Sequence, residues 1–245
     1  MTIIKKRRYK PFYKQFLKIR KNVQNRIKLF KFKKQKWSHL QKYSRRQLRF
    51  FRRYKIKDQF SLISNKFASR GNSYQQTFKK SLRNRTLFKL FYGGLKVKYL
   101  KLNINKLKQK KNHKLKFQNY KQSILKHLES RLDVILYRAK FSHSIKNARQ
   151  LILHGHILIN GDKIRTNSYI TKQNDLIEVA NNYKSRNLVK KNIDRSNFWP
   201  TPPSYLQVNY RTFQIIVGLS DESAVLPIFS FYINIDSVIS DINKY

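Results

Sequence analysis

Cysteine is absent from this 245-residue sequence, and methionine occurs only at position 1. Without thiols the chain cannot form disulfides, a cysteine zinc site or a cysteine nucleophile. Long apolar runs are missing as well: no stretch approaches the roughly 18 residues that a membrane-spanning helix needs, and none has the pattern of an amphipathic helix with its cations on one face. We therefore expect no disulfide scaffold, no thiol chemistry and no membrane partner.

Acidic residues are scarce: 11 Asp and Glu stand against 56 Lys and Arg, which gives a formal net charge of +45. Self-repulsion would strongly oppose a compact, isolated protein with this charge. Phosphates present dense negative charge and release condensed counterions when cations approach, so nucleic acid is the natural partner. Alanine is also rare, whereas Lys, Asn, Ile, Phe and Tyr abound, a bias that favours an A/T-rich, organelle-encoded gene.

The charge divides the chain into three expected segments. Residues 1–128 contain 41 basic residues and a single acid, Asp58, for a net charge of +40. Residues 129–180 carry +3 and residues 181–245 carry +2. We expect a highly basic, mainly helical or extended RNA-binding region, then a compact module, then a nearly neutral segment rich in β-formers.

Aromatic rings alternate with cations in the first segment, as in RRYKPFYK at 7–14, LFKFKKQKW at 29–37 and RFFRRYK at 49–55. Cations bind phosphates while rings stack on unpaired bases, a combination that suits irregular RNA. The alternative is that the rings form a core between basic helices. Because repulsion is strong and apolar surface limited, we expect partial disorder here, notably over residues 1–60, until the partner binds.

Residues 124–139 have the period of one amphipathic helix. With 3.6 residues per turn, one apolar stripe gathers Leu125, Leu128, Leu132, Ile135, Leu136 and Ala139. Arg131 and Arg138, seven residues apart, are expected together along one edge of this helix.

A second helix is predicted to begin after Ser144 as N-cap and to end at Gly155 as C′ residue. Its buried face should comprise Ile145, Ala148 and Ile152, with Leu151 on the shoulder. Lys146, Arg149 and Gln150 should share another face, because residues three and four apart are neighbours on a helix.

A β-hairpin is predicted in HILINGDKIR at 156–165, with Asn160-Gly161 as its turn, because both residues accept positive φ. DLIEV at 175–179 supplies a further strand. The predicted fold class is therefore α+β, with two helices packed on a short sheet. Such a rigid unit, with cations on one side, can fix its register on a folded partner.

These elements carry a resemblance. RLDVILYR at 131–138, NARQLILHGHILING at 147–161 and DLIEV resemble the small RNA-binding domain of the S-four family of ribosomal proteins. LFYGGL at 90–95 resembles the family's Tyr-Gly element. PSYLQVNYRTFQIIV at 203–217 resembles the strand segment that follows the domain, particularly in versions from plant-type mitochondria. The resemblance implies a structural protein of a mitochondrial, or alternatively plastid, small ribosomal subunit, whose partners are small-subunit ribosomal RNA and neighbouring ribosomal proteins.

The resemblance also implies which residues face RNA. The matching positions are Arg131, Arg149, Gln150, His154, Gly155, Asn160 and Gly161. Arg138 and Lys146 complete the predicted set, Lys146 as the substitute for a family Arg that is replaced here by Ile145. Asp133 is expected to orient the helix start and its arginine, because a carboxylate would repel phosphate. The family usually has Gly where this chain has Lys140.

Other functions are weighed against RNA binding. His154 and His156 lack supporting carboxylates or thiolates, so no metal site is predicted. No glycine-rich phosphate loop or catalytic triad spacing occurs, so neither a cofactor nor a small-molecule substrate is expected. R-L-D at 131–133 is also similar to the catalytic motif of pseudouridine synthases, but its continuation differs, and too few residues follow 180 for their catalytic domain. We expect a non-enzyme.

Two alternatives stay open. One is a ribosome-associated RNA-binding factor or a DNA-compacting protein in place of a ribosomal component. The other concerns FWPTPPSYLQVNY at 198–210 and LPIFSFYINIDSV at 226–238, which predict either strands packed on the body or a surface that faces proteins.

Overall fold

The computed structural model describes residues 14–24, 29, 31–43, 74–110, 117–194, 202–218, 229, 231 and 233–244. Its contacts divide the chain into two compact units, Met1–Asn72 and Ser73–Tyr245. Each unit is described separately. The boundaries expected from charge, at 128 and 180, do not coincide with this division.

The first unit contains helix α1 (Lys14–Ile19) and a second helix at 35–43. Phe16 and Trp37 are buried, and the rings of Phe32 and Trp37 lie 4.7 Å apart. These rings therefore belong to a core, as the core alternative predicted. The ring-rich stretch at 49–55, most of 7–14 and much of the region expected to be disordered lie outside the described residues.

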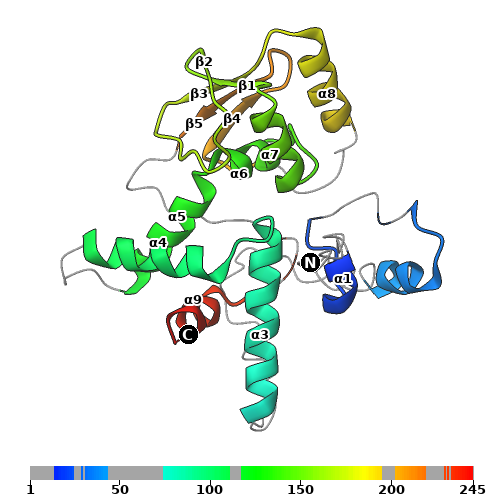
Figure 1. Ribbon diagram of the computed structural model, residues 1–245, viewed down its shortest axis with the longest axis vertical. Coiled ribbons are helices and arrows are strands. Elements are labelled where there is room, and N and C mark those ends of the chain that lie inside the picture. The colour runs from blue at the N-terminus through cyan, green and yellow to red at the C-terminus, as the bar shows by residue number, and fades with distance from the viewer. Residues whose placement is uncertain are drawn as a thin grey trace, which may run out of the picture. The chain divides into compact units, whose positions relative to one another are not determined.

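Four helices form the lower part of the second unit in Figure 1: α3 (Tyr74–Phe91), α4 (Val97–Lys110), α5 (Phe117–Glu129) and α9 (Ile235–Lys244). The end of α3 buries three aromatic side chains that contact Phe229 and Phe231: Phe88, Phe91 and Tyr92. The closest of these contacts, between Phe91 and Phe229, has a centroid distance of 4.8 Å. This aromatic cluster ties the C-terminal region to α3.

Helix α9 takes the place of the β-structure expected over 235–238, the last four residues of 226–238; residues 226–228, 230 and 232 lie outside the described residues. Its buried residues are Ile235, Val238, Ile239 and Ile242, which recur with a helical spacing. Asn234 caps the helix start, because its side-chain oxygen accepts a hydrogen bond from the backbone N–H of Ser237 at 3.2 Å. The β-branched residues had suggested a strand, but their spacing and this cap favour a helix.

The upper part of the second unit is a five-stranded antiparallel sheet in the order β2-β1-β3-β5-β4. The strands are β1 (Ile157–Ile159), β2 (Asp162–Lys163), β3 (Leu176–Val179), β4 (Leu206–Asn209) and β5 (Gln214–Val217). The hairpin and the 175–179 strand are confirmed. Because β3 pairs with β5, the strands near 203–217 extend the sheet of the module, which continues beyond residue 180.

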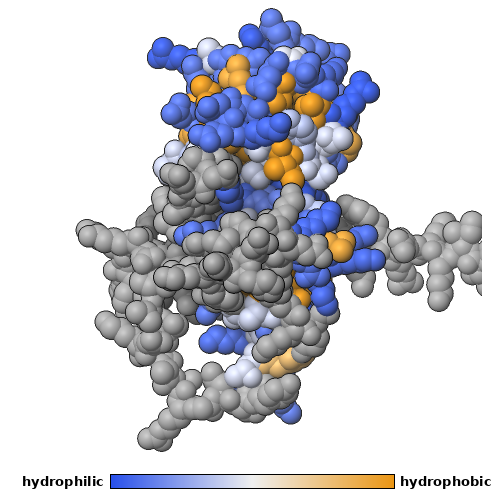
Figure 2. Space-filling view, turned by 90° about the vertical axis from the view of Figure 1, so that its left-hand side faces the viewer, coloured by the Kyte–Doolittle hydropathy of each residue, from blue (hydrophilic) through white to orange (hydrophobic). Residues whose placement is uncertain are grey.

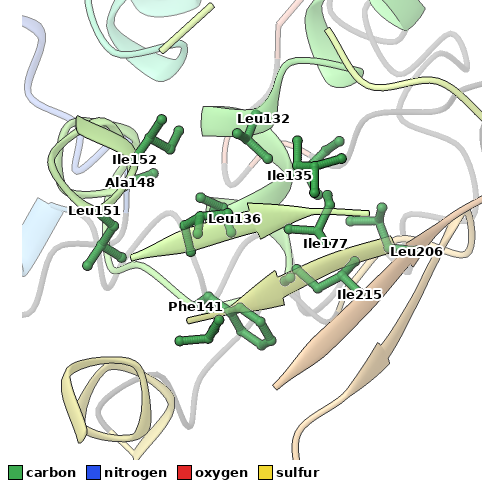
Figure 3. Packing of buried hydrophobic residues seen from close by; sticks show 14 of the residues in the cluster. Leu132, Ile135, Leu136, Phe141, Ala148, Leu151, Ile152, Ile177, Leu206 and Ile215 are labelled. Atoms are coloured by element: carbon green, nitrogen blue, oxygen red, sulfur yellow. The ribbon is translucent and has the colours of Figure 1, made fainter. Parts of the chain in front are cut away.

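One face of the sheet is covered by α6 (Leu132–Arg138) and α7 (Ile145–Leu153), whereas α8 (Tyr183–Asp194) connects β3 to β4 (Figure 1). Figure 3 shows Leu136 of α6 between Ile152 of α7 on one side and Ile177 and Ile215 of the sheet on the other, all within one cluster. All four side chains are fully buried. The predicted α+β class is thus confirmed, with its two helices packed on the sheet.

The helix expected at 124–139 is interrupted after Glu129. Arg131 adopts an extended conformation (φ −70°, ψ 132°) and forms a β-bridge with Ile170. The backbone N–H of Leu132 donates to the carbonyl of Tyr169 at 2.9 Å. The apolar stripe is buried as predicted, but it is divided between α5 and α6, because this short strand pairing replaces the helical hydrogen bonds at the break.

The predicted ends of α7 and of the hairpin are confirmed. The hydroxyl of Ser144 accepts a hydrogen bond from the backbone N–H of Asn147 at 3.2 Å, and Gly155 has φ +70°. Asn160 and Gly161 have φ of +50° and +90°, which fits a type I′ turn. Lys140 also has a positive φ, +65°, which explains why glycine suits this position in the family that the chain resembles.

Candidate nucleic-acid interface

The outward face of α7 presents Lys146, Gln150 and His154 at intervals of four residues, and all three are exposed. The opposite face is fixed in the core by Ile145, Ala148 and Ile152, as predicted. Because the helix is held by its apolar face, the polar face can contact a partner without rearrangement.

The β1–β2 hairpin continues this face of α7. A Cβ atom placed on Gly155 would collide with the side chain of Lys163, so the lysine tail lies directly over this glycine. The rings of His154 and His156 stack with centroids 5.9 Å apart. We call the surface formed by Lys146, Gln150, His154 and Lys163 the α7–hairpin surface.

His156 lies behind the α7–hairpin surface, with its Nδ1 atom 2.8 Å from the hydroxyl of Ser185. Burial lowers the pKa of His156 below its ordinary value, and the nearby charges of His154 and Lys163 lower it further. This positive potential disfavours another proton, and it would attract an anion such as a phosphate.

Asn160 has a structural task. Its side-chain nitrogen donates to the Asp175 carboxylate at 3.1 Å, and its side-chain oxygen accepts from the backbone N–H of Leu176 at 2.9 Å. These two hydrogen bonds hold the turn against β3 and the residue before it. Gly161 lies at the exposed tip with open space around it, so the turn can approach a partner closely through its backbone.

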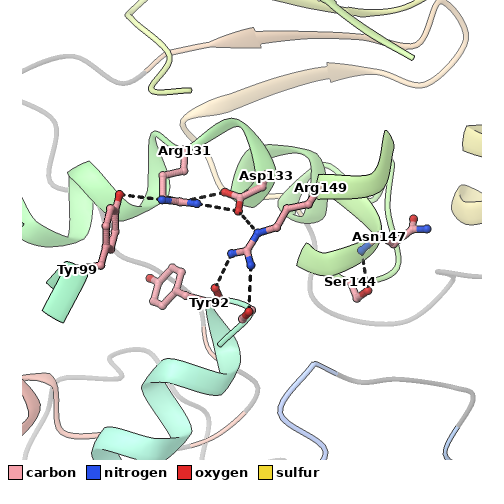
Figure 4. A network of polar contacts seen from close by, with 8 residues as sticks. Tyr92, Tyr99, Arg131, Asp133, Ser144, Asn147 and Arg149 are labelled. Carbon is pink, nitrogen blue, oxygen red and sulfur yellow. Dashed lines mark hydrogen bonds and ion pairs between the residues drawn. The ribbon is translucent and has the colours of Figure 1, made fainter. Parts of the chain in front are cut away.

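A buried carboxylate holds two of the predicted RNA-binding arginines (Figure 4). Asp133, which is fully buried, accepts hydrogen bonds from Arg131 at 3.0 Å and from Arg149 at 2.7 Å. Arg131 also donates to the hydroxyl of Tyr99 in α4 at 2.8 Å. Asp133 orients its arginine as predicted. The RNA contact predicted for Arg131 conflicts with this burial, since only 5% of its side chain is exposed.

Arg149 connects α7 to the end of α3. Two of its guanidinium nitrogens donate to the backbone carbonyls of Tyr92 and Gly93, each at 3.1 Å (Figure 4). Carbonyls in the last turn of a helix lack intrahelical partners and favour a nearby cation. The LFYGGL stretch is thus bound directly to the module. Because 22% of the Arg149 side chain is exposed, one edge can still meet a phosphate.

The RNA contact predicted for Arg138 conflicts with the position of this side chain in the fold. Arg138 is buried and donates two hydrogen bonds to Glu129, at 2.8 and 2.9 Å. The hydroxyls of Tyr92 and Tyr205 each donate to the same carboxylate at 2.7 Å. Helical periodicity suggested that Arg131 and Arg138 share one cationic edge. It could not show that each arginine forms an ion pair with a different buried carboxylate.

The Glu129 cluster, which consists of Glu129, Arg138, Tyr92 and Tyr205, is electrostatically balanced. Burial alone would raise the pKa of Glu129, but the Arg138 charge and the hydrogen bonds from Arg138, Tyr92 and Tyr205 together lower it. Burial raises the pKa of both tyrosines. The cluster joins α3, α5, α6 and the segment before β4, so it positions the module.

Lys163 was not among the predicted RNA-facing residues. The signal was available, because it follows the Asn-Gly turn by two residues in the predicted hairpin. Only the fold, however, places its side chain over Gly155.

The visible part of the sheet-containing region in Figure 2 is mostly hydrophilic, with separate small hydrophobic patches. This surface suits a charged, hydrated partner.

Two further findings concern the described part of the chain. Its helices include none with the length and apolarity to cross a bilayer. Its His, Asp and Glu side chains form no group of three or more that could hold a metal ion.

Comparison with known proteins identifies the module. Residues 130–177 match the family described as the S4 domain, so the unit built from α6, α7 and β1–β3 is an S4 domain. Beyond the S4 domain, the chain is similar to small ribosomal subunit protein uS4m of Marchantia polymorpha, with 32% identity over 176 residues, 70% of this chain and 84% of that protein. This chain belongs to the uS4 family.

Other relatives match shorter parts. Protein uS4c of Chlorokybus atmophyticus is 36% identical over 141 residues, 55% of this chain and 66% of that protein. Protein uS4 of Kosmotoga olearia is 42% identical over 88 residues, 36% of this chain and 42% of that protein.

Proposed function

We propose that this chain is a structural component of the small subunit of an organellar ribosome, where it binds small-subunit ribosomal RNA and supports assembly and translation. The observation that carries the proposal is the α7–hairpin surface, held rigidly on an S4 domain in a chain with a net charge of +45. Relatives named as small ribosomal subunit proteins support it.

Within the α7–hairpin surface, Lys146 and Lys163 would bind phosphates, while Gln150 and His154 would donate hydrogen bonds to phosphate or ribose oxygens. Gly161 would allow close approach of the RNA backbone, whereas Gly155, which is buried beneath the Lys163 side chain, would act by ending α7 and admitting that lysine. Arg149 would offer only its exposed edge, whereas Arg131 and Arg138 would act by holding the fold. The basic region 1–128 would bind additional phosphates, and the part of the nearly neutral segment 181–245 that lies outside α8 and the β4–β5 turn would face neighbouring ribosomal proteins.

The mitochondrion is the proposed location, with the plastid as the alternative. Similarity to uS4m of Marchantia polymorpha over most of that protein supports the first. Similarity to uS4c of Chlorokybus atmophyticus supports the second. Recovery of the chain in salt-washed small subunits from purified mitochondria, and not from plastids, would decide between them.

A binding experiment tests the α7–hairpin surface. The variant Lys146→Gln/Lys163→Gln should lower affinity for small-subunit ribosomal RNA about tenfold or more, and should flatten the slope of log K against log salt by about 1.8, at roughly 0.9 per phosphate. The control Lys172→Gln/Lys191→Gln removes two exposed lysines elsewhere in the same unit. Equal losses in both variants would mean that net charge, and not this surface, determines binding.

Enzymatic activity is not part of the proposal. In a pseudouridine synthase, the aspartate of the R-L-D motif must reach a flipped uridine. Here the Asp133 side chain has no exposure and is bound by Arg131 and Arg149. We expect no pseudouridine after the purified chain is incubated with ribosomal RNA, as measured by liquid chromatography and tandem mass spectrometry, which distinguish this isomer from uridine by retention and fragmentation. Detectable isomerisation that an Asp133→Asn variant abolishes would contradict this expectation.

A further inference from the structure

Helix α8 has a firmly anchored face. Ser185, Val189 and Asn192, spaced four and three residues apart, are buried against the module. The side-chain nitrogen of Asn192 donates to the carbonyl of Phe141 at 3.0 Å, and Ser185 contacts His156. The orientation of α8 is therefore fixed, which determines the side chains that it exposes.

The opposite face borders a surface hollow of about 220 Å³. Its lining consists of four residues of α8 and one residue of the β4–β5 turn: Tyr183, Arg186, Asn187, Lys190 and Phe213. Tyr183 is 81% exposed, far more than any other large hydrophobic residue of the described chain. Two cations and two rings thus meet at one hollow, and its described lining contains no carboxylate.

Phe213 reaches the hollow from a strained position. Its φ is +60°, a conformation that bulky side chains rarely adopt. Its ring packs 6.4 Å from that of Phe141, which fixes it on the module. Backbone strain of this kind persists only where surrounding structure holds it, and it is concentrated at binding sites.

Arg186 also borders a second hollow, of about 240 Å³, beside the sheet. Polar side chains line this hollow next to Arg186, among them Glu178, Thr212 and Gln214. The amide of Gln214 donates to the Glu178 carboxylate at 2.6 Å, which holds both groups in place. Arg186 therefore lies between an aromatic, cationic hollow and a polar one.

We propose that these two hollows bind consecutive unpaired nucleotides of an RNA single strand. One base would stack on Tyr183 beside Phe213, the adjoining phosphates would contact Arg186 and Lys190, and the polar groups beside the sheet would bind the edge of the next base. Rings with cations are the usual combination for single-stranded RNA. Among the lining residues, Lys190 favours RNA over a protein partner, because lysine is depleted from the centres of protein interfaces. The inference rests on the proposed function, since it assumes that the chain binds RNA.

The test uses the full-length chain and a short single-stranded oligouridine that contains 4-thiouridine. Bound oligonucleotide should protect Lys190 from acylation but leave its neighbour Lys191, on another side of α8, reactive. Photocrosslinks should be found at Tyr183 or Phe213. A Tyr183→Leu variant should lose most crosslinks and about fivefold or more in affinity, whereas Tyr183→Phe should retain both.

Matched charge variants separate a specific site from general attraction. Arg186→Gln/Lys190→Gln should reduce the salt slope by about 0.7 for each phosphate that is no longer neutralised, and should weaken binding more than Lys184→Gln/Lys191→Gln, which removes two charges from the same helix. Equal effects, or equal protection of Lys190 and Lys191, would overturn the inference while the proposed function stands. Absence of any RNA binding would overturn both. Protection of Lys190 only by added small-subunit proteins would identify a protein surface and overturn the inference.

Discussion

Replacement of Glu129 by Gln should destabilise the second unit strongly. Glu129 is fully buried and accepts four hydrogen bonds, two from Arg138 and one each from Tyr92 and Tyr205. The variant leaves the Arg138 guanidinium, whose side chain is 2% exposed, without a counter-charge, and directs an amide N–H₂ at groups that donate. Removal of one partner from a buried ion pair typically costs about 3–5 kcal/mol.

This loss is large compared with a total stability of about 5–15 kcal/mol. With an m-value of about 2 kcal/mol/M, the urea midpoint measured by circular dichroism at 222 nm should fall by about 2 M. Amide exchange in β3 should accelerate in parallel, because the Glu129 cluster joins the helices below the sheet to the segment that enters β4.

The double variant Glu129→Gln/Arg138→Met provides the control. It removes the uncompensated charge, and the remaining amide can still bond to both tyrosine hydroxyls, so at least half of the lost stability should return. A loss below about 1 kcal/mol for Glu129→Gln, or strict additivity in the double variant, would refute the claim that this pair is a buried counter-charge. Arg138→Met, where folded, should keep the wild-type salt slope for RNA, because the buried Arg138 cannot reach a phosphate.

The remaining predictions concern single sites. The Glu129 carboxyl has a folded-state pKa below its ordinary value of 4.5. Its contribution to the free energy of unfolding is therefore complete above pH 4.5 and is lost as the pH falls through the folded-state pKa. Urea midpoints measured from about pH 6 downwards should fall more for the wild type than for Glu129→Gln. Lys140→Gly should raise the free energy of unfolding by about 0.5–1 kcal/mol, because glycine relieves the positive φ. Lys146→Gly, within α7, should lower it by about 1 kcal/mol. Thermal melts that show a loss of stability in both variants would contradict the strain at Lys140. Asp133→Asn should cost about 3 kcal/mol, at the lower end of the range for a broken buried ion pair, because Arg149 is partly exposed and can be rehydrated. Amide protection at the end of α3 should weaken, since Arg149 would be held less firmly. Unchanged protection there would contradict a structural role for the network of Figure 4.

Local patterns in the sequence predicted local structure well. The Ser144 cap, the Gly155 terminus and the Asn160-Gly161 turn each depend on a few neighbouring residues, and each is found as expected. The interruption at Arg131 was not predictable in this way, because it depends on pairing with Ile170, thirty-nine positions further along the chain. The same holds for the β3–β5 pairing, which joins segments separated by α8.

The exposure expected of the predicted site residues is found for Lys146 and Gln150 on the helix face and for Asn160 and Gly161 in the turn, but not for Arg131 and Arg138. An exposed Lys146 or Gln150 follows from helical periodicity alone. An arginine next to an apolar stripe is ambiguous, since a buried carboxylate can capture it, and such carboxylates are few here. Of the 11 acids in the chain, Asp133 and Glu129 both bind arginine within the module.

The scarcity of acids gives these two carboxylates a disproportionate role. In a chain with a net charge of +45, an S4 domain would otherwise face mutual repulsion among its own cations. Asp133 and Glu129 bind three arginines inside the fold, so that two negative charges offset most of three positive ones, and these contacts join α3, α4, α6 and α7. The ammonium groups of lysines are strongly hydrated, and the described lysines remain at the surface. Arginine therefore builds the rigid body of the module, and lysine supplies most of the charge that this body offers to RNA.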